Sequence, residues 1–280
     1  MELYLILLGA GVISGIFTLL FGFAGGFVVV PLVYHTIRWS EPTNSLAHQM
    51  AFKSAVATSL LFMLLNTGLA TYRQYQQGKI HTPYLFPLAY WIGLGAILGT
   101  VVSQYLSADL LKWCFVLYLC VTIFDCIQRQ IKGSQLAPIS PSSKKHANHL
   151  NQKKQSFMGI LMGSIAAALG VGGSVMTVPF FRRKGLDMSS AVALANPLSV
   201  PVALAGCITL VLSQLFHAED LGGHFLGYFH YPALLCLFVG GYFGLKIAMP
   251  WSGRLSNPLH ERGYIVLLCL VLCSIFLPTI

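Results

Sequence analysis

Long hydrophobic runs, separated by short polar or Gly/Pro-containing stretches, fill most of the chain. A helix needs about 20 apolar residues to cross the hydrocarbon core of a bilayer, so runs of this length predict membrane-spanning helices. Eight hydrophobic segments are predicted, at residues 3–37, 46–70, 83–106, 110–127, 157–181, 191–215, 228–249 and 263–280. The predicted fold class is therefore all-α, in a polytopic membrane protein.

A polar stretch at residues 129–155 separates the first four segments from the last four. It contains Pro138, Pro141 and several Ser and Asn residues, which predicts a solvated linker. Six basic residues also lie in it: Arg129, Lys132, Lys144, Lys145, Lys153 and Lys154. The predicted organisation is a first transmembrane repeat at 1–128, the linker at 129–155, and a second repeat at 156–280.

The two halves resemble each other in sequence. At an offset of 148, four positions of the first half recur in the second, namely Gly22, Gly25, Val30 and Pro31 as Gly170, Gly173, Val178 and Pro179. Further blocks recur in the same order at offsets of 138 and 149. Because the order is collinear and the offset changes only at polar loops, we interpret the chain as two homologous four-segment halves.

The distribution of basic residues favours an arrangement in which the first segment of each half turns back at its glycines. If every segment crossed once, the side with the linker would carry eight Lys and Arg residues and the other side seven. If the first segment of each half turns back, the side with the linker carries thirteen and the other side two. A straight helix over 3–37 would also be about 52 Å long, against a hydrocarbon core of about 30 Å. We therefore predict inverted repeats in the plasma (inner) membrane, with linker 129–155 in the cytoplasm.

Composition excludes several classes of protein. Only 9% of residues are charged and 56% are hydrophobic, whereas about 25% of residues are charged in a soluble domain. The seven cysteines include no Cys-x-x-Cys pair, so neither a disulfide framework nor a zinc site is expected. We expect no cofactor and no metal. We also expect no nucleic-acid partner, because the net charge of +9 reflects the topology of the chain in the membrane.

Two glycine-rich sequences are the strongest candidates for a binding site. The first contains Gly22, Gly25 and Gly26, and the second runs through Gly170, Gly172, Gly173 and Ser174. Glycine permits unwound backbone inside a membrane, and a helix that restarts there directs free N–H groups and a positive dipole end at the bilayer centre. This arrangement suits an anion. The alternative is close packing of helices through small residues.

Four further polar residues lie within the hydrophobic segments. Thr58, Ser59 and Asn196 occupy aligned positions of the two halves, and we expect them to share a cavity with the glycine breaks. Their alternative role is ordinary hydrogen bonding between helices. Lys53 suits an anionic substrate as an intramembrane cation, although it could extend to the interface instead.

Other titratable residues have simpler interpretations. Asp125 is expected to pair with Arg129 at the membrane edge. His81 and His230 precede aligned prolines and are expected at the interface. His217, Glu219, Asp220 and His224 fall in a polar loop without the spacing of a metal site.

The paired glycine motifs, each followed by Val-Pro, together with Ala55–Ser59 and Ala193–Gly206, resemble the TauE/SafE family of sulfite and organosulfonate exporters. The resemblance covers nearly the whole chain outside the linker. It implies a multi-pass permease that moves small, often sulfur-containing anions, coupled to protons. The chain departs from the family pattern at Ala24, which replaces a glycine, and at Asn196-Pro197, which replaces Thr-Ser.

The predicted function is therefore a secondary transporter, in the direction of export, that works by alternating access around the two glycine breaks. Its expected partners are a small anionic substrate, the lipid bilayer, coupled protons and a second copy in a homo-oligomer. An anion channel, or a permease for carboxylates or other small solutes, is the alternative. An enzyme is not expected, because no cluster of catalytic acids, histidines or nucleophiles is present.

Overall fold

The structure is a computed structural model, and it describes residues 2–23, 25–78, 85–86, 88–131, 152–183, 186, 188–216, 220–251 and 257–276. Before the linker, the helices are α1 (Glu2–Phe21), α2 (Gly26–Ser40), α3 (Leu46–Gln49), α4 (Ala51–Gln76), α5 (Leu88–Tyr105) and α6 (Ala108–Ile131). After it come α7 (Gln152–Leu169), α8 (Ser174–Arg183), α9 (Met188–Phe216), α10 (Tyr231–Ala248), the 3-10 turn η4 (Met249–Trp251) and α11 (Asn257–Phe276). A two-stranded hairpin, β1 (Phe225–Leu226) and β2 (Phe229–His230), precedes α10.

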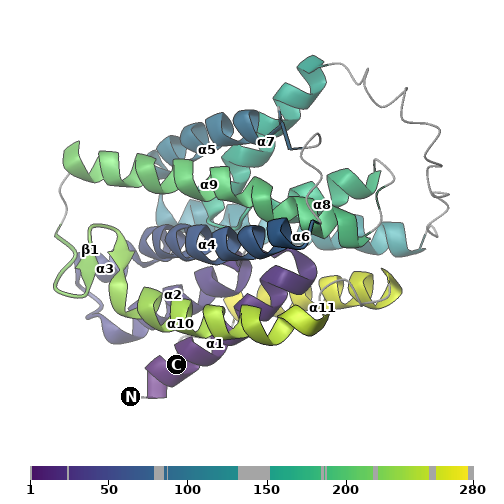
Figure 1. Cartoon of the computed structure of the whole chain (residues 1–280). Coiled ribbons are helices and arrows are strands. Elements are labelled where there is room, and N and C mark those ends of the chain that lie inside the picture. The colour runs from purple at the N-terminus through teal and green to yellow at the C-terminus, as the bar shows by residue number, and fades with distance from the viewer. Residues whose placement is uncertain are drawn as a thin grey trace, which may run out of the picture.

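The long helices form one bundle in which they run roughly side by side (Figure 1). At one end of the bundle, which we call the distal end, α4, α6 and α10 begin and α5 and α9 finish. Hydrogen bonds from Lys53 in α4 to Gln104 in α5, and between Gln104 and Ser213 in α9, connect these termini. We call the opposite end, where α6 finishes and α7 begins, the linker end.

The first and fifth hydrophobic segments are each interrupted at their glycines, as predicted. α1 stops at Phe21 and α2 begins at Gly26, while α7 stops at Leu169 and α8 begins at Ser174. The α1–α2 pair enters from the distal end and returns to it, because α1 runs parallel to α10 and the last turns of α2 contact the start of α6. The α7–α8 pair lies toward the linker end (Figure 1).

Glycines bring two pairs of helices into backbone contact. α1 packs on α10, and a methyl group at Gly15 or Gly244 would overlap the backbone of the other helix. α5 packs on α7 in the same way, through Gly95 and Gly99. We call these contacts the α1–α10 seam and the α5–α7 seam. Each seam joins a helix that precedes the linker to one that follows it.

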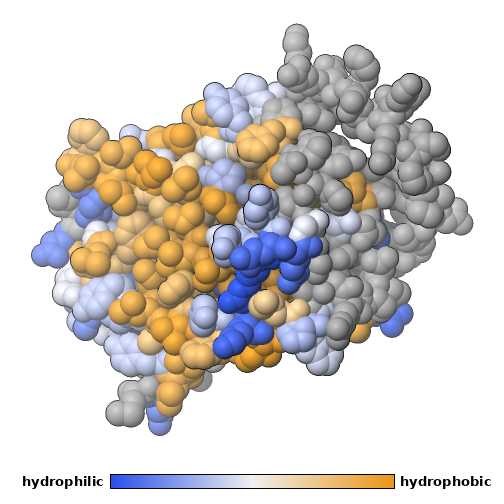
Figure 2. Space-filling model, viewed as in Figure 1, coloured by the Kyte–Doolittle hydropathy of each residue, from blue (hydrophilic) through white to orange (hydrophobic). Residues whose placement is uncertain are grey.

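The exterior of the bundle is hydrophobic, as expected for contact with lipid. Figure 2 shows an extensive hydrophobic face. Large apolar side chains such as Leu98 and Leu235 are more than half exposed. Six described helices are long and apolar enough to cross a membrane, namely those at Glu2–Phe21, Ala51–Gln76, Leu88–Tyr105, Ala108–Gln128, Ser190–Phe216 and Tyr231–Trp251. The prediction of an all-α polytopic membrane protein is confirmed. The internal duplication and the domain limits stay predictions.

Candidate functional site

The two glycine breaks lie against each other in the middle of the bundle. A Cβ atom on Gly26 would overlap the carbonyl oxygen of Gly170 and lie 2.9 Å from the Cα of Val171. Gly22 and Gly170, which align at the offset of 148, both adopt left-handed backbone, with φ of 69° and 66°. A residue with a side chain would be strained in this conformation. Glycine is therefore required for the turn of the chain and for the close approach of the two breaks.

Polar side chains from three helices stabilise the first break. The Thr18 hydroxyl lies 2.8 Å from both the Ser14 and the Phe23 carbonyl oxygens, and it accepts a hydrogen bond from the Asn66 amide at 2.7 Å. Asn196, in α9, donates to the Thr18 carbonyl oxygen at 3.1 Å. Unwound backbone inside a membrane needs partners of this kind. The N-cap residue of α2 is Gly25, which has no side chain to cap the first turn.

The second break is held from α4. The Ser59 hydroxyl donates to the carbonyl oxygen of Gly170 at 2.7 Å. Ser59 and Asn196 were both predicted to lie near the breaks. Ser59, in the first half, bonds to the interrupted segment of the second half, and Asn196, in the second half, bonds to that of the first. Thr58 faces elsewhere, because its hydroxyl donates to Ser54 and accepts from the backbone N–H of His230.

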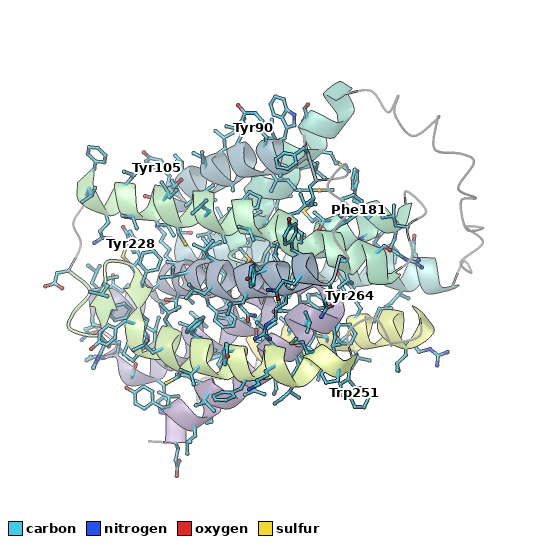
Figure 3. The ribbon with its side chains drawn as sticks, in the orientation of Figure 1. Tyr90, Tyr105, Phe181, Tyr228, Trp251 and Tyr264 are labelled. Carbon is cyan, nitrogen blue, oxygen red and sulfur yellow. The ribbon has the colours of Figure 1, made fainter. Side chains whose placement is uncertain are left out.

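A pocket of about 240 Å³ opens beside the second break at the distal end of the bundle. Lys53, Val56 and Leu60 of α4 form one wall, and Ala167 and Ala168, just before the break, form another. The remaining lining residues come from α5, α6, α9, the β-hairpin and the residue before α4: Thr100, Ser103, Gln104, Tyr105, Leu111, Leu210, Ser213, Tyr228 and Met50. Tyr105 and Tyr228 mark this end in Figure 3.

The pocket combines one positive charge with several hydroxyl groups. Lys53 is the only charged side chain among the described residues that line it, and its ammonium group donates to the Gln104 carbonyl oxygen at 2.8 Å. Thr100 is 1% exposed, and its hydroxyl has no hydrogen-bond partner in the described part of the chain. A buried hydroxyl without a partner is unfavourable unless a ligand or water supplies one.

The β-hairpin closes the pocket on the side of α10. Tyr228 at its tip lines the pocket, and His230 at its end is buried. The His230 ring caps α10, with Nδ1 accepting a hydrogen bond from the Ala233 N–H at 3.3 Å. Burial, and to a smaller extent the neighbouring His224, lowers the pKa of His230 to about 4. The ring is therefore neutral at pH 7, as a capping acceptor must be.

Sequence reasoning identified only part of this site. It singled out Lys53 and the glycines, but it missed Thr18 and Asn66, which satisfy the first break, and Thr100, which lines the pocket. A hydroxyl one turn from a glycine break is the signal that would have indicated Thr18. For Thr100 no signal exists in the sequence, because its role depends on the packing of α5 beside α4.

Several predicted residues have ordinary surroundings or lie outside the described structure. Gly173 has room, because the Val202 side chain lies 3.6 Å from the position that a Cβ would take there, and Ser174 is fully buried. His81, His217, Glu219 and the side chain of Arg129 lie outside the described residues. In the ranges that are described, no group of three or more His, Cys, Asp or Glu residues could hold a metal ion.

Comparison with known proteins finds relatives that are named as membrane transporters. The chain is 24% identical over 279 residues to a probable membrane transporter protein of Haemophilus influenzae, covering 98% of each chain. It is 23% identical over 262 residues to a probable membrane transporter protein of Methanocaldococcus jannaschii, covering 92% of this chain and 89% of the relative. No solved structure matches the chain.

A family model also matches, over residues 7–275, and its description is sulfite exporter TauE/SafE. The match spans both interrupted segments, the pocket and both seams. The family and the relatives' names indicate a membrane transporter rather than an enzyme, as the sequence predicted. The chain belongs to the TauE/SafE family.

Proposed function

We propose that this membrane transporter is a secondary carrier that exports small, sulfur-containing anions such as sulfite or organosulfonates. The observation that carries the proposal is the pocket beside the second break, whose one described charge is the ammonium group of Lys53. Its volume, about 240 Å³, is below the roughly 300–1,000 Å³ of pockets that hold drug-sized ligands. A pocket of this size and sign suits a small anion.

The lining offers the hydrogen bonds that an oxyanion accepts. The Thr100 hydroxyl has no partner in the described part of the chain, and Lys53 supplies a charged donor. The Ser103 and Ser213 hydroxyls, which donate to the Thr100 carbonyl oxygen and to Gln104 in this state, would turn to the anion when it binds. Hydrogen bonds to a charged group are stronger than those between neutral groups, and the effect increases where water is excluded. The Gly170 carbonyl oxygen accepts from Ser59 and, as an acceptor, does not bind an anion, so side-chain donors hold the anion in this state.

The glycine breaks then form the barrier between the pocket and the linker end. They contact each other through Gly26 and Gly170, just beyond the pocket wall at Ala167 and Ala168. In the proposed cycle, the two interrupted segments separate, and backbone N–H groups in the first turns of α2 and α8 receive the anion. The pocket would then close at the distal end and open toward the linker.

The helix packing supports the predicted inverted repeats on which this cycle depends. The first helix of each half packs on a helix of the other half, since α1 packs on α10 while α7 packs on α5. Such an exchange is what two copies related by an axis in the membrane plane would produce. With the linker in the cytoplasm, as the distribution of basic residues favours, the pocket described here faces outward.

Flux into proteoliposomes tests the function. We expect saturable uptake of 35S-sulfite that follows an imposed pH gradient and is competed by thiosulfate, sulfoacetate or small carboxylates in proportion to their affinity. Liposomes without protein are the control. Saturable, gradient-driven flux supports a carrier, whereas flux at channel rates without saturation contradicts it. Transport of uncharged solutes in place of these anions would overturn the assignment of substrate.

A further inference from the structure

A basic cluster of residues that do not line the pocket lies at the distal end. Arg38, in the last turn of α2, places its guanidinium carbon 5.9 Å from the centroid of the Tyr34 ring. Lys112, near the start of α6, places its ammonium nitrogen 5.3 Å from the same centroid. The charge distribution assigned only these two basic residues to the distal side. Both charged groups therefore lie within 6 Å of the centre of one aromatic ring.

The Tyr34 ring is a fixed platform for the two charges. It packs edge-on against Phe52 of α4, with ring centroids 5.9 Å apart, and its helix neighbours Val33 and Ile37 are fully buried. A cation over the face of an aromatic ring is attracted by the ring's quadrupole. The ring thus holds both cations at a defined place, although they repel each other.

Two carboxylates lie near the cluster in sequence, Glu41 three residues after Arg38 and Asp109 three residues before Lys112. Neither Arg38 nor Lys112 forms an ion pair with any carboxylate that the structure describes, and the buried Nε of Arg38 lacks a hydrogen-bond partner there. Lys112 also lies one turn inside the N-terminal, positive end of α6, where a cation is unfavourable. A bound anion would offset both the repulsion and the unpartnered N–H.

The position of the cluster relative to the bilayer indicates the kind of anion. Each cation is followed in sequence by an exposed tryptophan, Trp39 at 74% and Trp113 at 59% exposure. Tryptophan is enriched at the level of the lipid headgroups, because its ring is apolar and its N–H is polar. Arg38 and Lys112 therefore lie at headgroup level, where the available anion is a phosphodiester.

We propose that Arg38, Lys112 and Tyr34 form a binding site for the phosphate of an anionic phospholipid at the distal end of the bundle. The guanidinium and ammonium groups contact the phosphate oxygens, and Trp39 and Trp113 flank the lipid at the interface. A lipid held here bridges α2, which follows the first glycine break, and α6. The site does not depend on which solute the protein transports.

Lipid competition tests the proposal. The full chain is reconstituted in nanodiscs of equal parts phosphatidylglycerol and phosphatidylcholine, and the lipids retained after detergent extraction are measured by native mass spectrometry. Wild-type protein should retain phosphatidylglycerol preferentially. The double substitution Arg38→Gln and Lys112→Gln should reduce that preference by roughly fivefold for each charge removed. Lys112→Gln alone, which changes a half-buried residue, should show one such step if the double variant is unstable.

The matched control removes two charges elsewhere. Lys246→Gln with Arg262→Gln changes exposed residues of α10 and α11, and it should keep the preference for phosphatidylglycerol. Equal preference in the wild type and the Arg38/Lys112 variants would overturn the site. Displacement of phosphatidylglycerol by excess inorganic phosphate would show that the cluster takes free phosphate, and would overturn its assignment to lipid.

Discussion

Among the described residues, some buried polar groups hydrogen-bond to the backbone of the glycine breaks, and others have no partner. Thr18, Ser59 and Asn196 hold the backbone of the glycine breaks. The Thr100 hydroxyl, by contrast, is buried in the wall of the pocket without a partner among the described residues. This difference separates residues that maintain the fold from those available to a ligand.

Replacing Thr100 by Val tests that distinction. Because the hydroxyl has no protein partner to lose, Thr100→Val should leave the melting temperature in detergent unchanged or slightly higher. The same change should weaken anion binding several-fold, by about 1 kcal/mol for one lost hydrogen bond. Ser59→Ala is the contrasting variant, since its hydroxyl is engaged by Gly170, and it should lower the melting temperature. Equal effects of both variants on stability would contradict the distinction.

The cap at His230 makes stability depend on pH. Its pKa is lowered from 6.5 to about 4, so protonation favours the unfolded chain. The contribution of the neutral ring is complete above pH 6.5 and is lost as the pH falls toward 4, by up to about 3 kcal/mol. His230→Asn keeps a capping side chain that does not titrate. Between pH 8 and pH 5, the melting temperature should therefore fall more steeply for the wild type than for this variant. An equal fall in both proteins would contradict the assignment.

At the scale of elements, the glycine seams determine how closely the helices pack. Gly11 and Gly15 on α1, Gly240 and Gly244 on α10, and Gly95 and Gly99 on α5 each have the Gly-x-x-x-Gly spacing of close helix contacts. Sequence reasoning followed the glycines of the breaks and overlooked this repeated spacing. The Gly-x-x-x-Gly spacing could be read from the sequence, but the sequence did not indicate that α1 would pack on α10.

A pair of alanine substitutions on one helix tests the α1–α10 seam. A methyl group at Gly15 would overlap the Gly241 carbonyl oxygen, so Gly15→Ala should destabilise the protein by about 1–3 kcal/mol. Gly9, six residues earlier on α1, has no neighbour within 4 Å of the position that a Cβ would take. Gly9→Ala should therefore be neutral or slightly stabilising. A similar fall in melting temperature for both variants would contradict direct backbone contact at the seam.

At the scale of the whole molecule, the sequence predicted the class of fold and the two interruptions, because hydrophobic length and glycine clusters are local properties. The pocket could not be predicted in the same way. Lys53, Thr100 and Ser213 belong to three different helices, and no local pattern indicates that their side chains face one cavity. The cluster at Tyr34 could not be predicted for the same reason, since Arg38 and Lys112 approach one ring only when α2 and α6 pack together.

The exchange of seam partners predicts that the halves depend on each other. Residues 1–131 expressed alone would leave the glycine faces of α1 and α5 without α10 and α7, and we expect this fragment to be degraded. Coexpression with residues 152–280 should yield a complex that copurifies in detergent. Stable accumulation of either fragment by itself would show that each half folds independently and would contradict the importance of the seams.

Equilibrium binding of 35S-sulfite to the purified protein in detergent tests the central claim, that the pocket around Lys53 holds the transported anion. Lys53→Gln should weaken binding roughly tenfold, because a charge-assisted hydrogen bond contributes about 1.5–3 kcal/mol. Lys246→Gln, which removes the same charge from an exposed position on α10, should leave affinity unchanged. Undiminished sulfite binding by Lys53→Gln, or an equal loss in both variants, would contradict the account.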